Sequence, residues 1–213
     1  MVRKARYIPE ERPKGNVHEE LSLLFGTQNE APDSDEYLQI CCCGTHGTGK
    51  TTLMWEVFKW LKKEVRIPVV PCAESSRDPL LDVHSEDYER LLIQKRASMF
   101  HHFGHFVADR SLLDPLAYQK VTRGHINKEL MEFAFKFTNQ CLFYVPIKFD
   151  LVGDGVRPVG EEYQRNVQIV LEKVLKRWGG KYYTVTRVDL VERLEFVKHV
   201  ILDREGWKDK FKL

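Results

Sequence analysis

The sequence predicts one α/β domain in which helices cover both faces of a parallel sheet, and two observations support this prediction. From residue 37 onward, short apolar segments alternate with longer segments of helical periodicity, a pattern typical of parallel strands joined by helical crossovers. The first apolar segment runs directly into a glycine-rich loop, residues 44–51, and then into a helix. The chain has 213 residues, 43% of them hydrophobic, which suits one domain with a substantial core.

The individual elements follow from local apolar patterns. Strands are expected at residues 37–43, 67–72, 106–108, 142–147 and 182–186, and helices at residues 51–65, 86–103, 115–122, 128–140, 161–178 and 190–202. The helix at residues 161–178 is the most regular, because its apolar residues recur at helical spacing. Basic residues fill its last turn, and Gly179 and Gly180 end it. Asp114, followed by Pro115, is typical of a helix N-cap, so we interpret it as structural.

Residues 1–36 are predicted to be an N-terminal extension and residues 37–213 the main domain. The extension carries three prolines and ends in the acidic run 33–36. Its first residues are basic, yet no apolar segment follows them, so it does not resemble a secretion signal. The five cysteines form no C-x-x-C pair, which favours a reduced, cytoplasmic setting.

The composition gives no sign of a nucleic-acid or membrane partner. The 33 basic and 31 acidic residues give a formal charge of +2, so the total charge does not require nucleic acid or a membrane surface. No apolar run reaches eighteen residues, and no membrane span is expected. The sequence is compatible with a homodimer.

The loop at residues 44–51 is the most informative motif. It reads Gly44-Thr45-His46-Gly47-Thr48-Gly49-Lys50-Thr51 and fits the phosphate-binding pattern G-x-x-x-x-G-K-[ST]. Its backbone N–H groups would surround the phosphates of a nucleotide, as would the N-terminus of the following helix, which includes Thr52. Lys50 is expected to reach the β- and γ-phosphates, and the Thr51 hydroxyl to bind Mg²⁺.

Charged residues follow two other predicted strands. Asp109 and Arg110 follow the third strand, and Glu74 and Arg77 follow the second. Ligands gather at the carboxyl ends of parallel strands, so Asp109 is a candidate Mg²⁺ ligand and Arg110 a candidate for binding a phosphate or substrate. Glu74 is a candidate general base for an acceptor hydroxyl, and Arg77 a candidate acceptor ligand. Plain surface ion pairs and turns are the alternative.

The segment at residues 150–160 has three glycines, a proline and one arginine. This composition fits a loop that closes over phosphates, and Arg157 together with Arg165 on the next helix would stabilise the transferring phosphoryl group. A plain connecting loop is the alternative.

Gln94 interrupts the apolar face of the helix predicted at residues 86–103, where it is a candidate for contact with a nucleobase.

These motifs, in this order, resemble the small P-loop kinases of the AAA_28 family, which includes ribosylnicotinamide kinase domains and phage enzymes. The elements concerned are GTHGTGKT, ESSR, DRSLLDPLAY and GDGVR. The third is also similar to the Glu-Arg-Ser element of deoxynucleoside kinases, with Asp109 in place of glutamate. The resemblance implies a P-loop NTPase fold with strand order 2-3-1-4-5 and a lid near residues 150–165. It also implies ATP and Mg²⁺ bound by Lys50, Thr51 and Asp109.

Three functions follow as hypotheses. The first is an ATP- and Mg²⁺-dependent kinase of a small nucleoside- or nucleotide-like hydroxyl compound. The second, implied by phage relatives, is a kinase of hydroxymethylated bases in DNA, such as 5-hydroxymethyluracil; the basic residues 3–6 are its independent support. The third is a non-catalytic nucleotide switch, against which stand Glu74 and the arginines of the lid.

Overall fold

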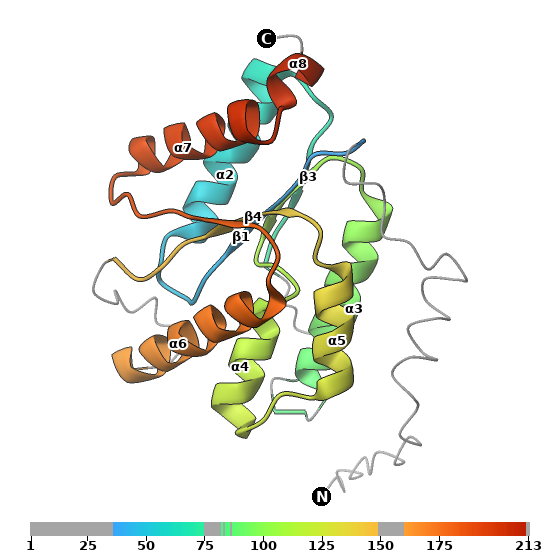
Figure 1. The fold of residues 1–213 in the computed structure, drawn as a ribbon, viewed down its shortest axis with the longest axis vertical. Coiled ribbons are helices and arrows are strands. Elements are labelled where there is room, and N and C mark those ends of the chain that lie inside the picture. The colour runs from blue at the N-terminus through green and yellow to red at the C-terminus, as the bar shows by residue number, and fades with distance from the viewer. Residues whose placement is uncertain (1–35, 75–81, 83, 86, 149–159, 212–213) are drawn as a thin grey trace, which may run out of the picture.

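The structure, a computed structural model, describes residues 36–74, 82, 84–85, 87–148 and 160–211. Within these residues the chain forms a five-stranded sheet in the order β2-β3-β1-β4-β5, and every strand pairing is parallel. Helices cover both faces of the sheet (Figure 1). The predicted fold class and strand order are therefore confirmed. The expected extension lies, apart from Glu36, outside the described residues.

The bounds of the elements differ from the predicted ones mainly at their ends. The strands are β1 (Gln39–Cys43), β2 (Val70–Cys72), β3 (Phe106–Asp109), β4 (Cys141–Tyr144) and β5 (Tyr182–Thr184). The helices are α2 (Lys50–Trp60), α3 (Tyr88–His102), α4 (Asp114–Arg123), α5 (Lys128–Phe137), α6 (Glu161–Trp178), α7 (Leu190–His199) and α8 (Trp207–Phe211). A π-helical turn continues α2 over Leu61–Val65, and another continues α7 over Val200–Arg204.

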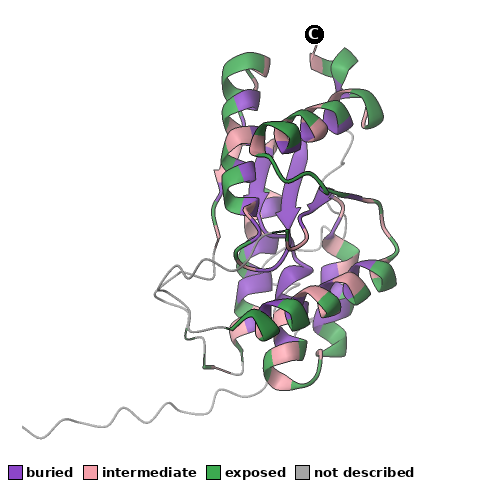
Figure 2. Cartoon of the chain, turned by 90° about the vertical axis from the view of Figure 1, so that its left-hand side faces the viewer, coloured by how far each residue is buried: buried purple, intermediate pink, exposed green. Residues whose placement is uncertain are grey.

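The sheet separates two apolar clusters, because successive residues of a strand point to opposite faces. Cys41 and Cys43 of β1 pack in the cluster beneath α3, α4, α5 and α6. Cys42, between them, packs in the cluster beneath α2, α7 and α8. Figure 2 shows the buried strands between helices whose outer faces are exposed.

All five residues of β1 are buried, as expected for a central parallel strand covered on both faces. Its partners are β3 on one side and β4 on the other. β2 and β3 lie on one side of β1, and β4 and β5 lie on the other. In folds of this kind ligands bind at the carboxyl ends of the strands, where the strand order reverses. The glycine-rich loop begins at this point. Among the described residues, no helix is both long and apolar enough to cross a membrane.

Candidate active site

The phosphate-binding loop joins β1 to α2, and its first glycine is required by close packing. A Cβ atom at Gly44 would lie 2.5 Å from the backbone oxygen of Val145, after β4. Gly49, which precedes α2, has a φ of 78° and contributes no side chain to cap the helix. The N–H groups of the first turn of α2 are thus left for a ligand, and an anion is the favoured one.

Lys50 is buried within the loop at 3% exposure. Its Nζ atom donates a hydrogen bond to the backbone oxygen of Thr45 at 3.3 Å and lies 3.9 Å from Oδ1 of Asp109. Burial, helped by the nearby charge of Arg110, lowers the pKa of Lys50. A desolvated ammonium group in a loop of N–H donors is suited to binding a phosphate oxygen.

Asp109 ends β3 directly opposite the start of α2. The Thr51 hydroxyl donates a hydrogen bond of 2.5 Å to Oδ2 of Asp109, whereas Oδ1 is buried and accepts no hydrogen bond from the described residues. This oxygen forms an ion pair with the Lys50 ammonium at 3.9 Å. Because a buried carboxylate oxygen without a hydrogen-bond donor is costly, it is also fitted to bind a metal cation. Thr51 is exposed, whereas Asp109 is 2% exposed, so a ligand would approach this pair from the side of Thr51.

Arg110 connects the loop to the end of β2. Its Nε donates to Oε1 of Glu74 at 2.7 Å and its Nη1 to the backbone oxygen of Gly44 at 3.3 Å. Its guanidinium also lies over the ring of Tyr118, 4.9 Å from the centroid. Arg110 and Glu74, distant in sequence, therefore form an ion pair beside the phosphate loop.

Asp114 holds the loop and the β3–α4 turn together. Its Oδ1 accepts a hydrogen bond from the Gly44 N–H at 3.0 Å, and its Oδ2 accepts from the N–H and the hydroxyl of Ser111, both at 2.8 Å. The interpretation of Asp114 as an N-cap was wrong in detail, because α4 begins at Asp114 itself and has no side-chain cap. The carboxylate instead binds the first glycine of the phosphate loop.

His46 links the loop to α4 and α6. Its N–H donates to the Tyr118 hydroxyl at 3.1 Å, and its backbone oxygen accepts from Nε2 of Gln164 at 2.6 Å. Burial alone would raise the pKa of Tyr118, but the charges of Arg110 and Lys50 outweigh it, so the net shift is downward. The third residue of the loop is thereby fixed from two helices.

Arg193 of α7 links the loop to the segment after β5. Its Nη1 donates to the backbone oxygen of Thr48 at 2.9 Å, and its Nε to the backbone oxygen of Arg187 at 2.8 Å. A Cβ atom at Gly49 would lie 3.0 Å from this guanidinium. The loop is therefore held from α4, α6 and α7, all outside the motif itself.

A sequence profile of the AAA_28 family, described as an AAA domain, matches residues 39–193. The chain belongs to the AAA_28 family. This match spans the phosphate loop, Glu74, the Asp109-Arg110 pair and Arg193. No match was found among curated proteins.

Solved structures with a similar fold include kinases of nucleotides and nucleosides. Thymidylate kinase from Ehrlichia chaffeensis has a TM-score of 0.56 and 17% identity, with 77% of this chain and 98% of that chain covered. Deoxyadenosine kinase from M. mycoides, with bound dCMP and dCDP, has a TM-score of 0.55 and 16% identity, with 77% and 98% covered. Its dATP complex has a TM-score of 0.51 and 14% identity, with 78% and 100% covered. At these identities the likeness concerns the fold.

The structure brings most of the predicted residues to one edge of the sheet. Lys50, Thr51, Glu74, Asp109 and Arg110 are connected through the contacts described above. Arg77 and Arg157, with most of the expected lid, lie outside the described residues. Arg165 is exposed on α6, where it forms an ion pair with Glu161 at 3.3 Å, and Gln94 is buried on α3. Their roles stay predictions.

Sequence reasoning missed Tyr118, Gln164, Arg193 and Arg96 as parts of the site. Arg96 of α3 is 2% exposed, and its Nη1 donates to the backbone oxygen of Ser111 at 3.0 Å, which supports the β3–α4 turn. Tyr118 carried a usable signal, because it follows Asp114 by one helical turn and so shares its face. Gln164 and Arg193 carried none, since 118 and 145 residues separate them from their loop partners.

Proposed function

We propose that this protein is a kinase that transfers the γ-phosphoryl group of ATP to a hydroxyl group of a nucleoside- or nucleotide-like acceptor, with Mg²⁺ as cofactor. The phosphates of ATP occupy the loop at residues 44–51, where backbone N–H groups and Lys50 bind them. The fold shared with a thymidylate kinase and a deoxyadenosine kinase supports an acceptor of nucleotide type.

The observation that carries this proposal is the contact between Thr51 and Asp109. The loop hydroxyl meets one carboxylate oxygen at 2.5 Å, and the other oxygen is buried without a hydrogen-bond donor among the described residues. Mg²⁺ prefers oxygen ligands and is commonly bound by one or two protein side chains together with waters and phosphate oxygens. Thr51 and Asp109 fit this role, and a bound Mg²⁺ would neutralise charge on the transferring phosphoryl group.

The acceptor side of the site is the ion pair between Glu74 and Arg110. Glu74 lies two residues after β2, the strand next to β3, and Arg110 links it to Gly44 of the phosphate loop. In this proposal its carboxylate takes the proton of an acceptor hydroxyl. The hydrogen bond from Arg110 fixes its orientation. Arg77 and Gln94 contact the acceptor in this proposal, and Arg157 and Arg165 belong to a lid near residues 150–165 that excludes water.

Two other functions are outcomes of the same experiment. A kinase of hydroxymethylated DNA bases would use the same phosphate site, but its independent support, residues 3–6, lies outside the described residues. A nucleotide switch would bind ATP and transfer nothing. The Glu74–Arg110 ion pair beside the loop favours a transferase, because a switch needs no group that accepts a proton.

The test is ADP release with Mg²⁺ and ATP in the presence of nucleosides, nucleotides, or DNA that contains 5-hydroxymethyluracil. We expect release that depends on a small nucleoside-type compound. Release that depends on modified DNA would identify a base in DNA as the acceptor, in place of a small nucleoside-type compound. Binding of ATP without stimulated release by any of these acceptors would contradict the kinase function.

The first prediction concerns Lys50. Its replacement in Lys50→Ala removes a charge that stabilises the transferring phosphoryl group, at a cost of about 4 kcal/mol in barrier and so about a thousandfold in rate. Single-turnover transfer of labelled phosphate measures this loss. Lys173→Ala, an exposed lysine on α6, is the matched control and should keep the wild-type rate. Wild-type turnover in Lys50→Ala would show that the phosphate loop does not take part in phosphoryl transfer.

A further inference from the structure

The peptide unit between Thr48 and Gly49 has little conformational restraint of its own. Gly47 and Gly49 flank Thr48, with φ angles of 71° and 78°. Glycine adopts positive and negative φ about equally readily, so the local sequence does not hold this unit in one orientation. The direction of its N–H group therefore depends on contacts from outside the loop.

Arg193 supplies such a contact from α7, which packs against α2 (Figure 1). Its Nη1 atom donates a hydrogen bond to the backbone oxygen of Thr48 at 2.9 Å. A Cβ atom at Gly49 would lie 3.0 Å from the same Nη1 atom. The absence of a side chain at Gly49 thus allows the guanidinium to approach the loop this closely.

A second carbonyl group fixes the orientation of the guanidinium. The Nε atom of Arg193 donates to the backbone oxygen of Arg187 at 2.8 Å, in the segment between β5 and α7. The donors of a guanidinium lie in one rigid plane, so the contact with Arg187 also determines where Nη1 points. Arg193 is 2% exposed, and hydrogen bonds are electrostatically stronger in such a buried setting than in water.

The direction of the Gly49 N–H follows from the geometry of a peptide unit. Among the described residues every peptide unit is trans, and in a planar trans unit the C=O and N–H groups point in opposite directions. The Thr48 oxygen points toward Arg193 on α7, so the Gly49 N–H points away from α7. A charged donor on the oxygen also polarises the unit and strengthens its N–H as a donor.

We propose that Arg193 is a positioning residue of the phosphate loop, which holds the Gly49 N–H in the orientation that binds a phosphate oxygen. Arg193 itself touches no phosphate; it acts through the peptide unit between Thr48 and Gly49. This inference rests on the proposed binding of ATP phosphates by residues 44–51. It does not depend on phosphoryl transfer to any acceptor.

Calorimetric titration of the full-length chain without an acceptor tests the inference, with ATP and inorganic tripolyphosphate as probes in the presence of Mg²⁺. Arg193→Met keeps the length of the side chain and removes its donors. We expect this variant to bind both probes about tenfold more weakly than the wild type. Tripolyphosphate is the decisive probe, because an effect that reached ATP through its base or ribose would leave tripolyphosphate binding unchanged.

Val197→Ala is the matched control, one helical turn further along α7. Val197 is fully buried and packs in the apolar cluster beneath α7, so its truncation lowers stability without removing a contact to the loop. This variant should bind both probes as the wild type does. Arg193→Lys retains a charge and N–H donors, and it should recover part of the affinity that Arg193→Met loses.

The amide resonance of Gly49 in ¹⁵N-labelled protein gives a direct readout of the peptide unit. Tripolyphosphate should shift this resonance in the wild type and in Val197→Ala, and should shift it less in Arg193→Met. A loss of stability alone would not separate the two variants in this way.

Three results would overturn the inference. They are unchanged tripolyphosphate affinity in Arg193→Met, equal weakening in Arg193→Met and Val197→Ala, and the lack of binding by either probe to the wild type. ADP release with an acceptor is measured separately. A protein that binds ATP, loses affinity in Arg193→Met and transfers nothing would support this inference and contradict the kinase function, whereas active transfer with unchanged affinity in Arg193→Met would do the reverse.

Discussion

Arg110 combines an unfavourable backbone conformation with a dense set of contacts. Its φ of 86° lies in the left-handed region, which costs a residue other than glycine about 1–3 kcal/mol. The contacts with Glu74, Gly44 and Tyr118 maintain it. The other described non-glycine residue with positive φ, Arg66, only ends a helical segment. Strain at Arg110 therefore coincides with the connection between the phosphate loop and Glu74.

The second prediction separates the two carboxylates of the site. Asp109→Asn removes the negative charge beside Thr51, so it should raise the Mg²⁺ concentration needed for half-maximal rate. Glu74→Gln should slow transfer while the magnesium dependence and ATP binding stay near those of the wild type. Magnesium titrations of the initial rate measure both effects. Superimposable magnesium profiles for the two variants would refute this division of roles.

The third prediction concerns pH. Burial and the charge of Arg110 lower the pKa of Lys50 below its ordinary 10.5. The protonated form binds phosphate, so kcat/KM for ATP should fall as pH rises through this lowered pKa in the free enzyme. The decline should therefore begin at lower pH than an ordinary lysine would give. The measurement is kcat/KM for ATP against pH.

Two variants assign the alkaline decline to its group. Lys50→Arg should remove it, because a guanidinium stays charged throughout the accessible range. Tyr118→Phe should retain it. The reverse result would assign the decline to the Tyr118 phenol, whose pKa is also lowered by Arg110 and Lys50 against the effect of burial.

At the scale of elements, sequence patterns predicted existence and type better than ends. The strand predicted at residues 67–72 begins at Val70, because its one partner, β3, begins at Phe106, which lies opposite Val70. The helices predicted to run to residues 65 and 202 do so partly as π-helical turns, which apolar periodicity does not distinguish from α-helix. Helix α8 has five residues, too few for a periodic pattern, and it was not predicted.

The phosphate loop was predictable because a local motif specifies it, whereas its supports were not. Asp114 illustrates the difference. Its neighbour Pro115 predicts a structural role at a helix start, but the contact with Gly44 spans 70 residues and depends on the pairing of β1 with β3. Contacts between distant segments follow from the sheet order, and no single segment encodes them.

The fourth prediction tests Asp114 as the link between these elements. Asp114→Asn preserves the size of the side chain but replaces one carboxylate oxygen with an NH₂ group. This NH₂ group would face an N–H or hydroxyl donor at a site that is 1% exposed. We expect a loss of about 2 kcal/mol in the free energy of unfolding and weaker ATP binding. Denaturant unfolding with and without ATP measures both.

A matched aspartate provides the control. Asp189 caps α7 through hydrogen bonds from the N–H groups of Val191 and Glu192, and asparagine serves equally well as an N-cap. Asp189→Asn should therefore leave stability nearly unchanged. Equal stability losses in Asp114→Asn and Asp189→Asn would show that the contact with Gly44 has no special importance.

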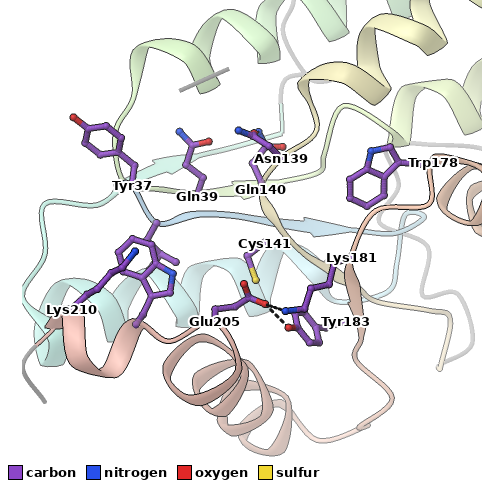
Figure 3. A pocket seen from close by; sticks show the side chains of 12 residues that line it. Tyr37, Gln39, Asn139, Gln140, Cys141, Trp178, Lys181, Tyr183, Glu205 and Lys210 are labelled. Carbon is purple, nitrogen blue, oxygen red and sulfur yellow. Dashed lines mark hydrogen bonds and ion pairs between the residues drawn. The ribbon is translucent and has the colours of Figure 1, made fainter. Parts of the chain in front are cut away.

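The two edges of the sheet differ in the features that they carry. The carboxyl edge carries the phosphate loop and the Asp109-Arg110 pair, and the other edge carries a cavity of about 230 Å³ lined by residues that include Gln39, Cys141 and Tyr183 (Figure 3). Between them, β1 and its neighbours are buried under helices on both faces. Charge is nearly balanced over the chain, with 33 basic and 31 acidic residues. The overall composition gives no steering toward a polyanion.

The last prediction concerns the size of the acceptor. A protein that acts on DNA neutralises several phosphates at once, so its affinity falls steeply with added salt as counterions are released. The balanced charge of this chain predicts weak binding to unmodified duplex DNA at physiological salt, with a Kd of about 10⁻⁴ M or weaker. Deletion of residues 1–15, which include the basic residues 3–6, should leave phosphorylation of a free nucleoside-type acceptor largely intact. Fluorescence anisotropy with labelled duplex DNA over a salt series measures the DNA affinity. ADP release measures the activity of the deletion variant. Submicromolar, salt-sensitive binding that disappears with the deletion would instead favour bases in DNA as the acceptor.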